Sequence, residues 1–150
     1  MVHVVVSKRA PNASSQYIWS KLENYSDFSW HPTVATSKDI GNVPDGSSNM
    51  IGAVRLLKND AGKELTETVT AWDTSKKHYS CSIDEGGPPF AKKLVIGFKV
   101  RDDPRQGVIV DTIVDLDLKG PFVILAPLIK LVLPKKIGSL TQGIADLQEQ

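Results

Sequence analysis

The stretch from Ile51 to Asp73 constrains the fold most, because it reads as two strands joined by a tight turn. The turn sequence Asp60-Ala61-Gly62 is typical of a three-residue hairpin loop in which the glycine takes the left-handed conformation. This loop pairs Arg55 with Glu67 on one face of the hairpin. A four-residue loop would shift the register by one residue and put the two charges on opposite faces, and the alternating pattern argues against that shift.

The predicted hairpin has one apolar and one polar face. The apolar face is expected to hold four cross-strand pairs: Leu57 with Leu65, Arg55 with Glu67, Ala53 with Val69, and Ile51 with Ala71. The other face carries mainly threonine and charged side chains and is expected to face solvent. The sequence therefore predicts a single ion pair on the inner wall of a sheet.

Length and composition predict one domain spanning residues 1–150, with a substantial core. A net charge of +1 gives no electrostatic reason to expect nucleic-acid binding. The N-terminus lacks a signal-peptide pattern, and the single Cys81 fits a reducing compartment, so we expect a cytoplasmic protein. The most apolar run, residues 121–133, is interrupted by Pro127 and Lys130 and is too short for a membrane span, so no integral membrane segment is predicted.

Residue patterns along the rest of the chain predict further strands over residues 2–8, 33–40, 77–85, 90–100 and 108–118. Two short helices are expected after the first strand, one with Asn12 as its N-cap and one over residues 24–29. A long C-terminal helix is expected to run to about Gln148, and Pro134 either kinks it or divides it from the apolar run.

Short turns between successive strands imply antiparallel neighbours. The predicted fold is therefore α+β, with a curved seven-stranded antiparallel sheet wrapped around the long C-terminal helix. Because the inward residues Ala53, Val69, Ala71 and Cys81 are small, we expect a cavity between sheet and helix.

With these elements in this order, the chain resembles the START/Bet v 1-like (SRPBCC) superfamily, which has the helix-grip fold. Within it, the chain resembles the polyketide cyclase/dehydrase-like branch. The resemblance covers essentially the whole chain. Its motifs are Ile18-Trp19, Trp30-x-Pro32, Gly52-x-x-Arg55, Glu67, the turn at Asp73, Tyr79 and Pro88-Pro89. It implies that the cavity holds an apolar or aromatic small molecule. Some members of the superfamily are enzymes, and many are carriers or receptors.

Members similar to plant lachrymatory-factor synthases use an inward Arg and Glu on this hairpin, which Arg55 and Glu67 match. Tyr79 matches the first of the tyrosines that such members use on following strands. Where the second is expected, this chain has Ala91-Lys92-Lys93. The resemblance thus implies Arg55, Glu67 and Tyr79 as catalytic candidates.

The chemistry of Arg55 and Glu67 allows two interpretations. A buried ion pair is weak evidence of stability, because desolvation of both ions offsets their attraction, so a pair inside a cavity points to ligand binding. Arg55 would then hold a ligand oxygen, and Glu67 would accept or donate a proton. The alternative is a purely structural pair. Tyr79 is expected either to hydrogen-bond a ligand carbonyl or to be a core tyrosine.

The expected cavity wall consists of seven further residues: Trp30, His31, Ala53, Val69, Cys81, Phe98 and Leu128. Trp30 is expected to act as a structural plug or a ligand contact. His31 is expected to face solvent or to act as a base, and Cys81 to be an unreactive core thiol.

No cofactor and no metal site are predicted, because His3, His31 and His78 are scattered and no phosphate-binding glycine loop is present. Asp111, Asp115 and Asp117 are expected to form a solvated strand face.

Residues 122–133 are expected to form the cavity lid, or a portal that makes a weak contact with a membrane or a protein. Three hypotheses follow for the chain: a carrier of an apolar or aromatic small molecule, a cofactor-free cyclase, dehydratase or isomerase, and a partner-binding module.

Overall fold

The computed structural model describes residues 1–24, 31, 34–41 and 49–149. Within these residues the chain forms an antiparallel seven-stranded sheet in the order β1-β7-β6-β5-β4-β3-β2. The strands are β1 (Val2–Arg9), β2 (Val34–Gly41), β3 (Val54–Asn59), β4 (Glu64–Asp73), β5 (His78–Glu85), β6 (Ala91–Asp103) and β7 (Gly107–Leu118). The helices are α1 (Ser15–Glu23), the 3-10 helix η1 (Gly120–Leu125) and α2 (Ala126–Ala145).

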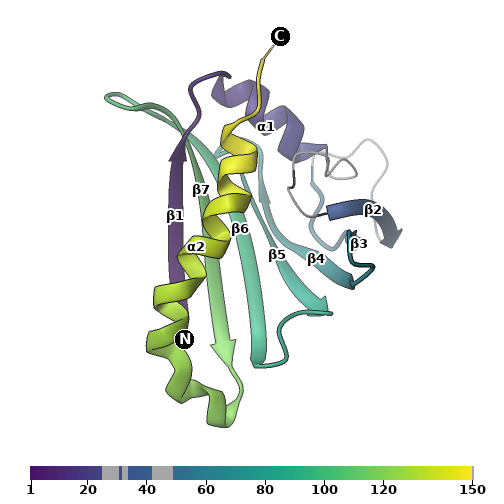
Figure 1. Cartoon of the computed structure of the whole chain (residues 1–150). Coiled ribbons are helices and arrows are strands. Elements are labelled where there is room, and N and C mark those ends of the chain that lie inside the picture. The colour runs from purple at the N-terminus through teal and green to yellow at the C-terminus, as the bar shows by residue number, and fades with distance from the viewer. Residues whose placement is uncertain (25–30, 32–33, 42–48, 150) are drawn as a thin grey trace.

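The sheet curls around α2, as Figure 1 shows. The helix packs on β1 and β7, at one side of the sheet, while β2, β3 and β4 curve round on the other side. Helix α1 lies near the C-terminal end of α2, and η1 lies at the opposite end of the molecule. The predicted α+β helix-grip architecture is therefore confirmed.

The central hairpin has the predicted register, with Arg55 opposite Glu67 and Leu57 opposite Leu65. Gly62 has a φ angle of 83°, the left-handed conformation that the turn was expected to need. The side-chain oxygen of Asn59 accepts hydrogen bonds from the backbone N–H groups of Ala61 and Lys63, at 3.0 and 2.9 Å. Local turn chemistry thus fixes which residues of this hairpin share a face.

The first strand of the hairpin is shorter than predicted. Residues 50–53 form a turn with Gly52 at a φ angle of 91°, and the backbone N–H of Ala53 donates to the carbonyl of Met50. Ala53 still neighbours Val69, whose N–H donates to its carbonyl. Ile51, however, is 53% exposed, so its predicted inward pairing with Ala71 is wrong.

Strand β4 contains an irregularity that the alternating pattern does not predict. Val69 pairs with Cys81, but Ala71, not Thr70, pairs with Ser80, so one extra residue lies in β4. Such a bulge reverses the alternation beyond it. Trp72 therefore lies opposite Tyr79 and packs on the core, and the prediction that Ala71 points inward is wrong.

Helix α1 begins two residues later than an N-cap at Asn12 would require. Ser14 is its N-cap, with the hydroxyl oxygen accepting from the backbone N–H of Tyr17 at 3.1 Å, so the predicted cap at Asn12 is wrong. Instead, the Asn12 carbonyl accepts from the N–H of Glu149. The second short helix, predicted over residues 24–29, lies almost wholly outside the described residues.

The outer face of β7 is not fully solvated as predicted. Asp111 is buried, because Ser7 and Arg101 on the two flanking strands both hydrogen-bond its carboxylate. Asp115 and Asp117 are only partly exposed. On the inner face, the hydroxyl of Thr141 on α2 donates to that of Thr112 at 2.7 Å and so fixes the helix on the sheet.

Helix α2 runs without interruption through Pro134 and ends at Ala145, earlier than predicted. Proline cannot donate to the carbonyl four residues earlier, so the helix lacks one backbone hydrogen bond there. The residues after Pro134 pack into the main core through Leu140 and Ile144. Before it, Ile129 and Leu133 pack on a second cluster around Val2, Val4 and Leu116.

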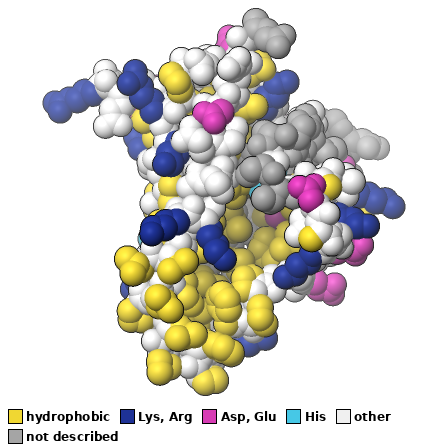
Figure 2. All heavy atoms as spheres, viewed as in Figure 1, with side chains coloured by type: hydrophobic (Ala, Val, Ile, Leu, Met, Phe, Trp, Pro, Cys, Tyr) yellow, Lys and Arg dark blue, Asp and Glu magenta, His cyan; other side chains and the backbone are white. Residues whose placement is uncertain are grey.

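Seven large hydrophobic side chains of η1 and the first half of α2 are exposed: Phe122, Val123, Ile124, Leu125, Leu128, Leu131 and Val132. We call this surface the apolar tip. Figure 2 shows hydrophobic side chains gathered at this end of the molecule. No helix among the described residues is long and apolar enough to cross a membrane.

Candidate functional site

A cavity of about 300 Å³ lies between the concave face of the sheet and α2. Its wall is mainly aliphatic and comes from β2 to β6, with one residue of α2. The lining residues are His31, Val34, Leu57, Asn59, Lys63, Leu65, Glu67, Cys81, Ile83, Gly86, Leu94, Ile96, Phe98 and Leu140. In Figure 2 it appears as a hollow with hydrophobic side chains in its floor, between α2 and the β2–β4 side of the sheet.

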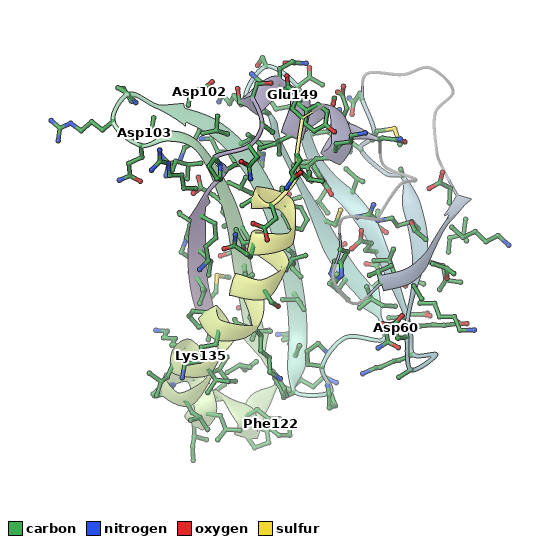
Figure 3. The ribbon with its side chains drawn as sticks, turned by 45° about the horizontal axis from the view of Figure 1, so that its top comes forward. Asp60, Asp102, Asp103, Phe122, Lys135 and Glu149 are labelled. Atoms are coloured by element: carbon green, nitrogen blue, oxygen red, sulfur yellow. The ribbon has the colours of Figure 1, made fainter. Side chains whose placement is uncertain are left out.

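The cavity lies toward one end of the molecule. Asp60 at the turn of the central hairpin and Phe122 on η1 lie at that end in Figure 3, and Asp102, Asp103 and Glu149 lie at the other. Asn59 and Lys63, which flank the hairpin turn, border the cavity. Asn59 is half-buried and Lys63 is exposed, so the cavity wall reaches the protein surface beside the hairpin turn.

The ion pair predicted from the sequence is present at the inner wall. Arg55 donates from Nε to Oε1 of Glu67, and the two side chains are only 1% and 7% exposed. Glu67 lines the cavity, whereas Arg55 is not among the lining residues. Arg55 therefore holds the carboxylate in place from within the protein, and Glu67 is the member of the pair that a bound molecule would meet.

His31 also borders the cavity, in agreement with its place in the predicted wall, and it is half-buried. Burial lowers its pKa to about 4, and the positive charge of Arg55 acts in the same direction. At neutral pH the imidazole is therefore uncharged. A neutral imidazole can both donate and accept a hydrogen bond, so His31 adds a polar group to the wall besides Glu67, Asn59 and Lys63.

Tyr79 lies in the core, as one of its two predicted alternatives had it. It is fully buried in an aromatic cluster, with ring centroids 5.3 Å from Trp72, 5.4 Å from Phe98 and 6.3 Å from Trp19. Burial raises its pKa well above the ordinary value, and the charge of Arg55 opposes that rise. The Arg55 side chain lies close enough to the Tyr79 hydroxyl to interact with it, which also lowers this pKa. Tyr79 thus closes the inner end of the cavity without lining it.

Cys81 lines the cavity next to the ion pair. Burial raises the pKa of its thiol, and the negative charge of Glu67 raises it further, so the thiol stays protonated at neutral pH. A protonated thiol is a poor nucleophile. Cys81 therefore contributes a small apolar surface to the wall, as expected for an unreactive thiol.

The other predicted wall residues differ in where they lie. Phe98 lines the cavity. Ala53 and Val69 are buried in the core and do not line it. Leu128 is 57% exposed on the outer side of α2, away from the lining residues, and Trp30 lies outside the described residues.

Most of the aliphatic wall was not named as cavity wall from the sequence, although Leu57 and Leu65 were expected on the inner face of the hairpin. Leu57, Leu65, Ile83, Leu94 and Ile96 lie on the inner sides of their strands and line the cavity. The alternation of each strand identifies these residues as inward. The prediction of the wall relied on small side chains and therefore did not include them. The position of the cavity depends on which part of the sheet α2 covers, and not on side-chain size alone.

No group of His, Cys, Asp or Glu residues that could hold a metal ion occurs among residues 1–24, 31, 34–41 and 49–149. The polar groups that border the cavity can hold or move a proton and can hydrogen-bond a ligand. They offer no evident ligand set for a metal.

Fold and site together define a helix-grip protein with an apolar cavity and one buried acid–base pair. The chain belongs to the family described as polyketide cyclase/dehydrase and lipid transport, whose profile matches residues 1–149. This family membership confirms the resemblance that the sequence motifs indicated. A search of curated protein sequences found no match.

Solved structures share this fold at low sequence identity. A protein from Nitrosospira multiformis is 21% identical with a TM-score of 0.73, over 95% of this chain and 93% of that chain. Ara h 8.0201 is 15% identical with a TM-score of 0.68, over 95% and 94% of the two chains. Major latex-like protein 151 from Panax ginseng is 15% identical with a TM-score of 0.65, also over 95% and 94%.

Proposed function

We propose that this chain binds a small, mainly apolar molecule carrying one polar group, and that Glu67 receives that group. The observation that supports the proposal most directly is the ion pair at the cavity wall. A carboxylate held by a buried arginine borders a mainly apolar cavity. Ligand sites are commonly apolar concave spaces with few, well-placed polar groups, and a volume of about 300 Å³ is at the small end of their range.

Inside the cavity the charges favour a neutral ligand that donates a hydrogen bond, and the other charged lining residue, Lys63, is exposed beside the hairpin turn. The charge of Arg55 is already balanced by Glu67, so the pair offers little net attraction to an anion. The Glu67 carboxylate accepts hydrogen bonds only, and the uncharged His31 can complete the contact. An aromatic or aliphatic alcohol meets these requirements.

Native mass spectrometry of the protein purified from its own source tests the proposal first, because it reveals a retained ligand by its mass. Calorimetric titration with 2-naphthol, a neutral aromatic alcohol, then tests the chemistry. We expect binding that Glu67→Gln weakens and that the exposed matched control Glu64→Gln leaves unchanged. No retained molecule together with no naphthol binding would reject the proposal.

An enzyme of the polyketide cyclase/dehydrase type is the second candidate, because the same carboxylate borders the space where a substrate would lie. In that case Glu67 would transfer a proton, and Arg55 would stabilise the oxygen that becomes negative. Binding and catalysis are separable by one comparison. Catalysed cyclisation, dehydration or isomerisation that Glu67→Gln abolishes while substrate still binds would favour the enzyme.

A further inference from the structure

The apolar tip is a large exposed hydrophobic surface that neither the cavity nor the core explains. Ile124, Leu128 and Leu131 are 79%, 57% and 71% exposed. On α2, Leu128, Leu131 and Val132 follow helical spacing and form one outward face, while Ile129 and Leu133 pack inward. The helix is therefore apolar on both sides in its first half. Surfaces of this kind mark sites of interaction.

The tip is surrounded by lysines and has no acidic residue along its own segment. Residues 118–145 contain Lys119, Lys130, Lys135 and Lys136, all exposed, and no Asp or Glu. The remainder of the chain has fourteen basic and seventeen acidic residues. The small net charge of the whole chain thus hides a basic, apolar end and an acidic remainder. Figure 2 shows Lys and Arg side chains beside the hydrophobic tip.

Shape and position add to this asymmetry. Helix η1 and the start of α2 project beyond the strands at one end of the molecule, as Figure 1 shows. Figure 3 places Phe122 at that end and Lys135 further toward the body of the protein. Apolar side chains at the extremity with cations behind them match the layers of a lipid surface, where acyl chains lie beneath charged headgroups.

We propose that the apolar tip docks on an anionic membrane surface, inserting its exposed side chains between lipid headgroups while the neighbouring lysines bind the headgroup phosphates. A second copy of the chain is a poorer occupant, because pairing two tips would bring together two copies of residues 118–145, each with four lysines and no Asp or Glu. An acidic protein partner would complement the lysines but gives no reason for apolar side chains at the very end of a projecting element.

Docking through the tip would place the cavity close to the membrane. Leu94 lines the cavity and also packs in the apolar cluster beneath the tip with Phe90 and Ile129. An apolar molecule leaving the bilayer at this point would therefore meet a continuous hydrophobic path. This consequence rests on the proposed function, whereas docking itself does not.

The test is cosedimentation of the full chain with phosphatidylcholine vesicles that contain or lack phosphatidylserine. We expect binding only to the anionic vesicles, weakened by added salt. Leu128→Ser combined with Leu131→Ser should weaken it by at least about tenfold, because apolar surface no longer inserts. The matched control, Ile40→Ser with Ile51→Ser, removes hydrophobic side chains that are similarly exposed elsewhere and should bind as the wild type does.

A charge variant tests the headgroup contact separately. Lys135→Gln with Lys136→Gln should weaken binding by about tenfold or more and reduce its salt dependence. Lys58→Gln with Lys76→Gln makes the same change of charge away from the tip and should have little effect. Glu67→Gln should bind vesicles normally, so a failure of the cavity proposal would not be confused with a failure of docking.

Three results would overturn the proposal: absence of binding to anionic vesicles, equal binding to neutral vesicles, or binding that the double serine variant leaves unchanged. Analytical ultracentrifugation tests whether the tip instead binds a second copy of the chain. A concentration-dependent dimer that the double serine variant dissociates would assign the tip to a second copy of the chain instead.

Discussion

The two ends of the concave face are built from the same strands and yet differ completely in packing. Toward α1, strands β4, β5 and β6 contribute Trp72, Tyr79 and Phe98, which pack with Trp19 into a filled aromatic end. Toward the hairpin turn, the same strands contribute aliphatic side chains that leave the cavity open. The difference shows that side-chain size along three strands, together with the position of α2, decides where the fold is hollow.

The largest expected effect concerns the filled end. Trp19→Ala should lower the free energy of unfolding by about 3–5 kcal/mol, because it removes a buried indole from the aromatic cluster and leaves a void. At the open end, Leu65→Ala should cost less than about 2 kcal/mol, because that side chain already borders empty space. Chemical denaturation measures both values, and equal losses would contradict the contrast between the two ends.

Removing only one partner of the ion pair should lower the free energy of unfolding nearly as much as Trp19→Ala does. Arg55→Met should lower the free energy of unfolding by about 3 kcal/mol or more, because it leaves the Glu67 carboxylate buried without its counter-ion. Arg55→Met combined with Glu67→Leu should recover much of that loss, since no buried charge remains. A double variant as unstable as the single one would show that the pair itself contributes strongly to stability.

The lowered pKa of His31 predicts a pH dependence. In the unfolded chain His31 has its ordinary pKa of 6.5, and in the folded chain its pKa is about 4. As the pH falls between these values, only the unfolded chain gains this proton, so stability is lost on acidification. The loss should be at most about 2 kcal/mol, because His31 is only partly buried.

His31→Gln should remove this component of the pH dependence. Denaturation curves collected between pH 7 and pH 4 should therefore have a shallower fall in the variant than in the wild type. All other titratable groups are the same in both proteins, so the difference between the two pH dependences comes from His31. Parallel curves would mean that His31 is not protected from protons in the folded state.

The smallest effect on stability should come from filling the open end. Ile96→Phe adds a ring where space is available, so the free energy of unfolding should change by less than about 1 kcal/mol, while binding of 2-naphthol is lost. The matched control Val69→Phe adds a ring to a fully packed site and should cost about 1–3 kcal/mol. Equal costs would show that the open end closes in solution.

Features set by local chemistry could be predicted from the sequence. The loop around Gly62 and the alternation on either side of it correctly placed Arg55 opposite Glu67. The succession of strands along the chain and the long C-terminal helix were predicted from periodicity and turn residues. The cap of α1 was misplaced because Asn12 and Ser14 are both good cap residues, and only the structure shows which one accepts the hydrogen bond.

Features set by contacts between distant residues could not be predicted in the same way. The bulge in β4 depends on pairing with β5, so alternation alone placed Ala71 inside and left Trp72 outside. Burial of Asp111 depends on Ser7 and Arg101, which reach it from two other strands. The extent of the cavity likewise depends on how far α2 covers the curled sheet, and so its aliphatic wall was recognised only from the structure.

The bulge in β4 also bears on how such proteins can diverge. Without it, a strand of the same length would pair Ala71 with Tyr79 and turn the Trp72 indole out of the core. Loss of the bulge at unchanged strand length, with no substitution in the core, would then replace the Trp72 indole at this position by the methyl group of Ala71. The pairing of β4 with β5, and not only the choice of core residues, therefore determines which side chain fills the aromatic end.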